Sequence, residues 1–182
     1  KVWNAARFVM TSLQGKPGDA RFIGAGLNGW YDLPRPQHRE DRWIVGRLDR
    51  LTAEVNQAME SFELGDAQQR LYDFIWNDFC DWYIEMAKIR LRSGAGPSPL
   101  PILAHVLERT LRLLHPFMPF ITEEIWQNLL ARLPKEGGLP ESIMVAPYPQ
   151  VTEARSDSGA EDEISLVMQA IHAVRNARAQ LR

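Results

Sequence analysis

The chain has 182 residues, of which 45% are hydrophobic, and its formal net charge is −2. Its length and apolar fraction predict one folded domain with a core of its own and exclude a largely disordered chain. The slightly acidic balance excludes a protein that coats nucleic acid by bulk positive charge, although it is compatible with one that reads a few bases locally.

The first predicted helix covers residues 2–13, and its two sides differ in character. One side is apolar at helical spacing and consists of Val2, Ala6, Val9 and Leu13. The opposite side carries Asn4, Arg7, Phe8 and Thr11. Residues 14–39 then hold five Gly and three Pro and predict a long surface loop.

Two long helices are predicted next, at residues 41–62 and 66–92. Asp66 followed by Gln69 resembles a capping box at the start of the second one. This helix is apolar on two faces. The first face consists of Leu71, Ile75, Phe79, Trp82, Met86 and Ile89. The second face consists of Tyr72, Trp76, Cys80, Tyr83 and Ala87, with Ile84 beside it. A helix that is apolar on most of its circumference is buried or has two neighbours, so we expect a further element against the second face.

The second half of the chain predicts three more helices. A Gly/Pro-rich linker, SGAGPSPLP, precedes a helix that ends at His115-Pro116. Helices are then expected at 122–133 and from 161 to the end, with an extended segment at 142–146 and a polar stretch at 150–160 between them. The short connections favour an all-α, antiparallel bundle of five to six helices.

The expected domain organisation is a bundle at residues 1–149, with loops 14–39 and 93–99 inside it, followed by a linker and a further helix at 150–182. The chain begins with Lys1, and both of its ends lie within helical patterns, so we expect it to be a piece of a longer protein. Its single cysteine cannot form an internal disulfide, which favours a reducing, cytoplasmic compartment. No signal peptide or membrane-spanning run is visible.

The patterns of common catalytic and metal sites have simpler explanations here. GAGLNG, residues 24–29, matches the dinucleotide-binding pattern, but no buried strand precedes it and no helix follows it. The E-x-x-H order of bundle di-iron sites is absent, and one cysteine with four scattered histidines forms no zinc-binding pattern. Cys80 has no neighbouring histidine or helix N-terminus to activate its thiol. We therefore expect no catalytic residue and no metal site.

Two polar helix faces are candidates for binding RNA. Asn4, Arg7 and Phe8 combine an amide, a guanidinium and an aromatic ring, the groups that hold unpaired bases by hydrogen bonding and stacking. From spacing alone we favour an ordinary amphipathic helix, because aromatic residues usually pack. A basic stripe on the last helix could meet phosphate, and it could equally be a solvated face or a partner contact. The stripe consists of His172, Arg175, Arg178 and Arg182.

Six segments, read together, carry a family resemblance. They are KVWNAARFVM, DRWIVGRLDRLTAEVNQAME, LYDFIWNDFCDWYIEMAK, LLHPFMPFITEEIWQ, SIMVAPYP and IHAVRNARAQ. In this order they resemble the anticodon-binding domain of class I aminoacyl-tRNA synthetases, in the valine, isoleucine, leucine and methionine group. FCDWY together with HPFMPF makes the chain most similar to the valyl-tRNA synthetases.

The resemblance implies a right-handed helical bundle that follows a Rossmann catalytic domain and holds the anticodon loop of valine tRNA. In such enzymes the first helix and the FCDWY-type helix together face the anticodon. By position, Phe8 would stack on a base and Arg7 would contact base or phosphate. Cys80 and Ile84, one helical turn apart, would supply apolar contacts. Asn4 and Tyr83 are further anticodon-binding candidates on geometry alone.

The resemblance also bounds the activity. The family's HIGH and KMSKS motifs are absent, so this piece is not expected to aminoacylate alone or to hold a cofactor; ATP and magnesium would belong to the parent enzyme. The expected partners are valine tRNA and the rest of the same polypeptide, its catalytic domain and C-terminal region, with no DNA and no membrane. Two alternatives remain: the anticodon domain of an isoleucine-type ligase, and a helical protein-interaction module without an RNA role.

Overall fold

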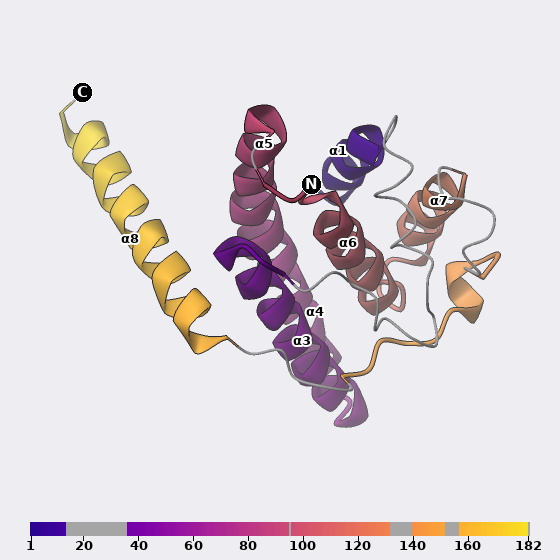
Figure 1. The fold of residues 1–182 in the computed structure, drawn as a ribbon. Helices are drawn as coiled ribbons and strands as arrows, with labels where there is room; N and C mark the ends of the chain where they lie inside the picture. Colours follow the sequence, from indigo (N-terminus) through magenta and orange to yellow (C-terminus); the bar gives the residue numbers. More distant parts are fainter. Residues whose placement is uncertain (14–35, 95, 132–139, 152–156, 182) are drawn as a thin grey trace.

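The computed structural model describes residues 1–13, 36–94, 96–131, 140–151 and 157–181, which form a bundle of helices (Figure 1). The elements are α1 (Val2–Leu13), α3 (Arg39–Glu60), α4 (Leu64–Asp73), the π-helix η2 (Phe74–Tyr83), α5 (Ile84–Ser93), α6 (Leu100–Leu114), α7 (Pro119–Leu130), the 3₁₀ turn η4 (Ile143–Val145) and α8 (Ser158–Gln180). No strand occurs in the described residues, and the prediction of an all-α bundle is confirmed. Most of the predicted loop at 14–39 lies outside the described residues.

Helix α6 is the centre of the bundle. Each of its 15 residues is buried, and it contacts α1, α3, α4, α5 and α7. Its leucines are all buried, and Pro101 lies in the first turn, where a helix does not use the missing N–H. Because neighbours cover α6 on all sides, its polar residues are buried together with its apolar ones.

The buried polar residues of α6 bind one another and backbone carbonyls of the segment that follows η4. Arg112 Nε lies 2.6 Å from Glu108 Oε1, and Arg112 Nη1 donates to the Pro147 carbonyl at 2.8 Å. Arg109 Nη2 donates to the Gln150 carbonyl at 2.6 Å. Burial raises the pKa of Glu108, and the positive charge of Arg112 opposes that rise. These guanidinium–carbonyl bonds hold the described residues after η4, 146–151, against the bundle.

The helix predicted at 66–92 is one continuous helix, but its middle is π-helical. Its buried line repeats every four residues and consists of Leu71, Ile75, Phe79, Tyr83 and Ala87. The predicted first face is wrong beyond Phe79, since Trp82 and Met86 are only half-buried and Ile89 is 61% exposed. The π-helix bonds residue i to i+5, so its turns are wider than the 3.6 residues on which the predicted face was drawn.

The predicted capping box at Asp66 is wrong. The helix begins at Leu64, and the Asp66 carboxylate instead accepts a hydrogen bond from Arg70 Nε at 2.7 Å. The turn that precedes it places Phe62 at φ 60° and lets the Glu63 N–H donate to the Ala58 carbonyl at 2.8 Å. Through this tight reversal, α3 and α4 pack against each other.

Two other boundaries also differ from the prediction. The fifth helix begins at Pro119 rather than at Thr122, and the Thr122 hydroxyl donates back to the Met118 carbonyl at 2.8 Å. The predicted extended segment at 142–146 is extended only at its ends, because its centre is the 3₁₀ turn η4. The Ser142 side chain caps this turn by accepting from the Met144 N–H.

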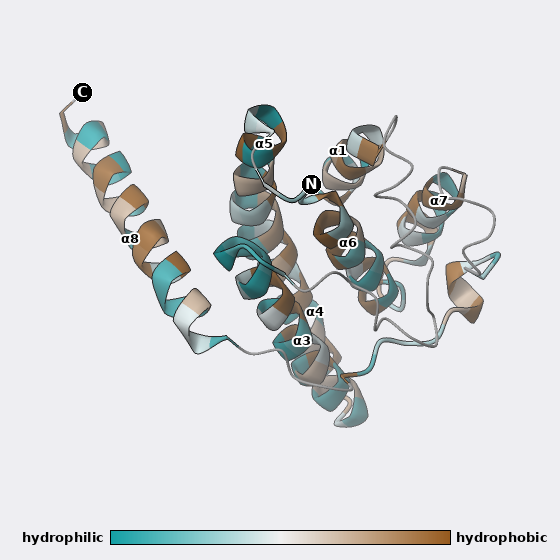
Figure 2. Cartoon of the chain, viewed as in Figure 1, coloured by the Kyte–Doolittle hydropathy of each residue, from teal (hydrophilic) through white to brown (hydrophobic). Residues whose placement is uncertain are grey.

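The first half of helix α8 is joined to α3. Ion pairs link Arg42 to Asp157 at 2.7 Å and Arg50 to Glu161 at 2.7 Å, and Ile164 is buried beside them. From there α8 projects from the bundle, with apolar and polar residues on its exposed surface (Figures 1 and 2). The proposed division between residues 149 and 150 stays a prediction.

Among the described residues, no helix is long and apolar enough to cross a membrane. Over the same residues, no group of three or more His, Cys, Asp or Glu side chains is arranged to hold a metal ion.

Removing the charged partner of Glu108 is expected to destabilise the bundle in a pH-dependent way. Arg112→Leu leaves the Glu108 carboxylate buried without its ion pair, which costs about 3–5 kcal/mol in the free energy of unfolding near neutral pH. Without Arg112, the folded-state pKa of Glu108 lies still further above the unfolded value. As pH rises, the unfolded chain therefore loses the Glu108 proton at a lower pH than the folded chain does. The free energy of unfolding falls across the interval between the two pKa values.

Urea unfolding at pH 5 and pH 8 measures this effect. We expect the loss caused by Arg112→Leu to be smaller at pH 5. The control is the double variant Glu108→Leu, Arg112→Leu. It removes the buried, unpaired carboxylate and is expected to recover most of the stability. An equal loss at both pH values would show that Glu108 is not the titrating group.

Candidate nucleic-acid interface

Helix α1 lies beside the long helix formed by η2 and α5 (Figure 1). Lys1 Nζ is 2.8 Å from Asp81 Oδ1, and Lys88 Nζ is 5.3 Å from the centroid of the Phe8 ring. The two contacts are seven residues apart on each helix, so α1 and η2–α5 run side by side in the same direction. Lys1 Nζ also lies 4.6 Å from the centroid of the Trp76 ring, so α1 is one neighbour of the long helix, while α3 and α6 pack against it more extensively.

The outer side of α1 presents Asn4 and Arg7 to solvent. Both side chains are exposed, and Arg7 Nη2 reaches Asn4 Oδ1 only at 3.5 Å, the limit of a hydrogen bond. Within the described part of the chain Arg7 forms no ion pair. Its guanidinium is thus available to bind a base edge or a phosphate.

Phe8 is half-buried and packs on the edge of the core. The ammonium group of Lys88 lies over its ring at a cation–π distance, and Lys88 also pairs with Glu85 at 2.6 Å. A base that stacks on this face of Phe8 would have to displace Lys88, which lies on a flexible stem. The displaced ammonium would then be close to the phosphates of the bound strand.

The other predicted anticodon-binding residues lie at different depths. Cys80 is half-buried, and burial raises the pKa of its thiol, so it is a neutral apolar group near α1. Ile84 is 5% exposed and Tyr83 is 0% exposed. The structure thus brings Asn4, Arg7 and Phe8 together on one accessible helix, but leaves Ile84 and Tyr83 almost no surface for a base. The role of the whole set in binding RNA stays a prediction.

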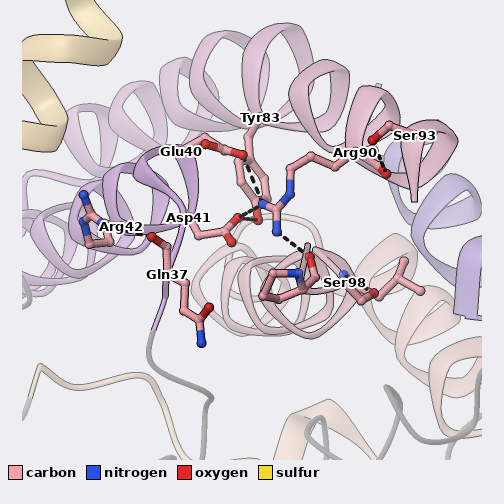
Figure 3. Close-up of polar contacts among 10 residues, drawn as sticks. Gln37, Glu40, Asp41, Arg42, Tyr83, Arg90, Ser93 and Ser98 are labelled. Atoms are coloured by element: carbon pink, nitrogen blue, oxygen red, sulfur yellow. Dashed lines mark hydrogen bonds and ion pairs between the residues drawn. The ribbon is translucent and has the colours of Figure 1, made fainter. Parts of the chain in front are cut away.

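Tyr83 belongs instead to a buried polar cluster behind this surface (Figure 3). Its hydroxyl donates to Asp41 Oδ1 at 2.7 Å, and Arg90 Nη1 donates to the same oxygen at 2.7 Å. Arg90 Nη2 also donates to the Pro97 carbonyl at 2.7 Å. Burial raises the pKa of Asp41, while its bonds to Tyr83 and Arg90 oppose that rise; burial and the nearby Asp41 place the pKa of Tyr83 well above its ordinary value. Through Arg90, the cluster joins α5 to the start of α3 and to Pro97.

An apolar groove lies at the N-terminal end of α1, and the sequence did not predict it. Its volume is about 390 Å³, and it runs between α1, the α4–η2 helix, the end of α6 and the start of α7. Trp3 and Tyr72 line it and are 41% and 50% exposed, and the Tyr72 and Trp76 rings stack with centroids 4.8 Å apart. In the sequence, the groove was indicated only by the second apolar face, which includes Tyr72 and Trp76. The sequence did not indicate that α7 would complete the groove.

The profile of the family described as "Anticodon-binding domain of tRNA ligase" matches residues 41–182. The chain belongs to this family. The matched region contains the long helix, the buried Asp41 cluster and α8, while α1 precedes it. The anticodon-binding domain therefore includes one of the two helices that form the candidate interface.

Curated relatives extend this similarity to α1. The chain is 47% identical over 180 residues to the valine–tRNA ligase of Dehalococcoides mccartyi strain CBDB1, with 99% of this chain covered. It is 44% identical over 184 residues to the valine–tRNA ligase of Geobacillus stearothermophilus, with 100% covered. In both comparisons the chain spans 19% of the relative's length.

The buried position of Tyr83 leads to a prediction that separates stability from RNA binding. Tyr83→Phe removes the hydroxyl that donates to Asp41 and is expected to lower the free energy of unfolding by about 1–3 kcal/mol. Binding of an anticodon hairpin by the folded anticodon-binding domain should not change. The matched control is Tyr72→Phe, whose side chain is 50% exposed and whose hydroxyl loss should cost little.

Chemical unfolding and a fluorescence titration with the hairpin measure the two quantities on the same samples. Unchanged stability together with weakened hairpin binding would place Tyr83 in the interface and refute its role in the core.

Proposed function

We propose that this chain is the anticodon-recognition domain of a valine–tRNA ligase, an enzyme that attaches valine to its tRNA with the use of ATP. The observation that carries the proposal is 44–47% identity over 99–100% of the chain to proteins of that name. Since the chain spans 19% of those relatives, catalysis, ATP and magnesium would belong to other parts of the parent enzyme. Those parts would be its second partner, and the groove at Trp3 and Tyr72 offers them an apolar surface.

The domain would act by binding alone. We infer that an unstacked anticodon base rests on Phe8 after Lys88 moves aside, and that Arg7 donates to the edge or phosphate of that nucleotide. Cys80 would add an apolar contact, and Asn4 would orient Arg7. Stacking on an aromatic ring tolerates any base, so discrimination between anticodons would come from the hydrogen bonds of Arg7 and Asn4.

Variants of Phe8 and Arg7 test this proposal. Phe8→Ala is expected to weaken binding of a valine anticodon hairpin by about 1–3 kcal/mol, because a stacking surface is lost. Arg7→Ala should weaken binding and also reduce the preference for the valine hairpin over one with a swapped central anticodon base. Fluorescence titration of labelled hairpins at low salt measures both effects, and circular dichroism checks that helicity is unchanged.

The matched control for charge is Arg70→Ala, which removes one cation from the side of α4 that faces α3. It should leave hairpin binding unchanged. Unfolding of both Phe8→Ala and Arg7→Ala would identify these residues as core and refute the site. Equal binding of the two hairpins by the unaltered chain would mean that only phosphates are contacted and that discrimination lies elsewhere.

A further inference from the structure

Charge is divided sharply along α8. Its first turns and their cap contain four acidic residues, Asp157, Glu161, Asp162 and Glu163. From residue 164 to residue 180 there is no acidic residue, and the charged groups there are Arg175 and Arg178, with His172 beside them. The acidic half is the part that is anchored to α3, where arginines meet three of its carboxylates at 2.7–2.8 Å. The basic half is left to project from the bundle (Figure 1).

The basic half of α8 contacts η2 at the half-buried Trp82. The His172 ring meets the Trp82 ring edge-on, with centroids 5.5 Å apart and an interplanar angle of 72°. The Arg175 guanidinium lies 5.7 Å from the Trp82 centroid. Trp82 is next to Asp81, the residue that pairs with Lys1 of α1. This contact therefore places the basic half of α8 on the same long helix that α1 lies against.

The cation–π contact leaves Arg175 able to bind an anion. A cation–π contact needs no N–H donor, and in the described residues no hydrogen bond from the Arg175 guanidinium is found, so its five N–H groups can bind an anion. Arg178 follows one helical turn later and is exposed. Among the residues that the structure describes, neither arginine forms an ion pair. Two guanidinium groups on one exposed helix, without a carboxylate nearby on that half, form a surface complementary to a polyanion.

We propose that Arg175 and Arg178 form a second RNA contact of this domain, to the phosphate backbone of the anticodon stem. The inference rests on the proposed function, since it assigns the stem of the same tRNA whose loop meets α1. Phosphate contacts position an RNA but do not read its bases. The two sites would thus have different roles. Helix α1 would distinguish the anticodon, and α8 would position the stem beside it.

Single substitutions of the two arginines test the contact in the full chain. Arg175→Gln and Arg178→Gln are each expected to weaken binding of the valine hairpin and of the swapped hairpin by the same factor, roughly threefold to tenfold at low salt. Each should also reduce the slope of log K against log salt by about 1. The preference between the two hairpins should stay as in the unaltered chain. Arg70→Gln, with the same loss of charge on α4, should change neither affinity nor slope.

Each other result decides against the inference in a different way. If both variants keep the original affinity and slope while the unaltered chain prefers the valine hairpin, the α8 contact is refuted and the proposed function stands. If the variants lose the preference between hairpins, the arginines read bases rather than phosphate. If the folded, unaltered chain binds neither hairpin, both proposals fail for this domain. Unchanged RNA binding together with self-association that Val174→Ser abolishes would identify α8 as a protein-docking helix.

Discussion

The bundle depends on one constraint, the burial of α6 on all of its sides. It contacts α1, α3, α4, α5 and α7, and its complete burial also encloses Glu108, Arg109 and Arg112. A buried charge is tolerated only when it is paired and hydrogen-bonded. The pairing of Glu108 with Arg112, and the bonds from Arg109 and Arg112 to backbone carbonyls, meet that requirement and hold the chain between η4 and α8 in place.

The candidate interface follows from the same arrangement. Both α1 and α5 pack on α6, so two helices more than 70 residues apart in sequence lie side by side with their outer faces accessible. Behind them, the Asp41, Tyr83 and Arg90 cluster ties α5 to the start of α3 through directed hydrogen bonds. Side chains on rigid helices are positioned more accurately than side chains on loops. Recognition of an anticodon would therefore need only local movement, such as that of Lys88.

A net charge of −2 and a role in RNA binding are compatible because of where the charges lie. Many carboxylates are used within the protein: Glu54 and Asp66 pair with Arg70, Asp78 with Arg47, and the acidic half of α8 with α3. The cations without such partners in the described residues include Arg7, Arg175 and Arg178. Local potential, rather than the sum over the chain, decides where a polyanion is attracted.

The sequence by itself determined the helical class, most helix bounds within a few residues, and the polar face of α1, because hydrophobic periodicity and Gly/Pro breaks are local signals. It could not determine which side of the long helix would be buried. That outcome depended on the π-helical turns of η2, which move Tyr83 and Ala87 onto the line of Phe79 and leave Ile89 exposed. Ile84, expected at the anticodon from the resemblance, and Tyr83, expected there on geometry, lie in the core. Only tertiary packing decided this for Tyr83, since its hydroxyl donates to Asp41 of a separate helix, α3.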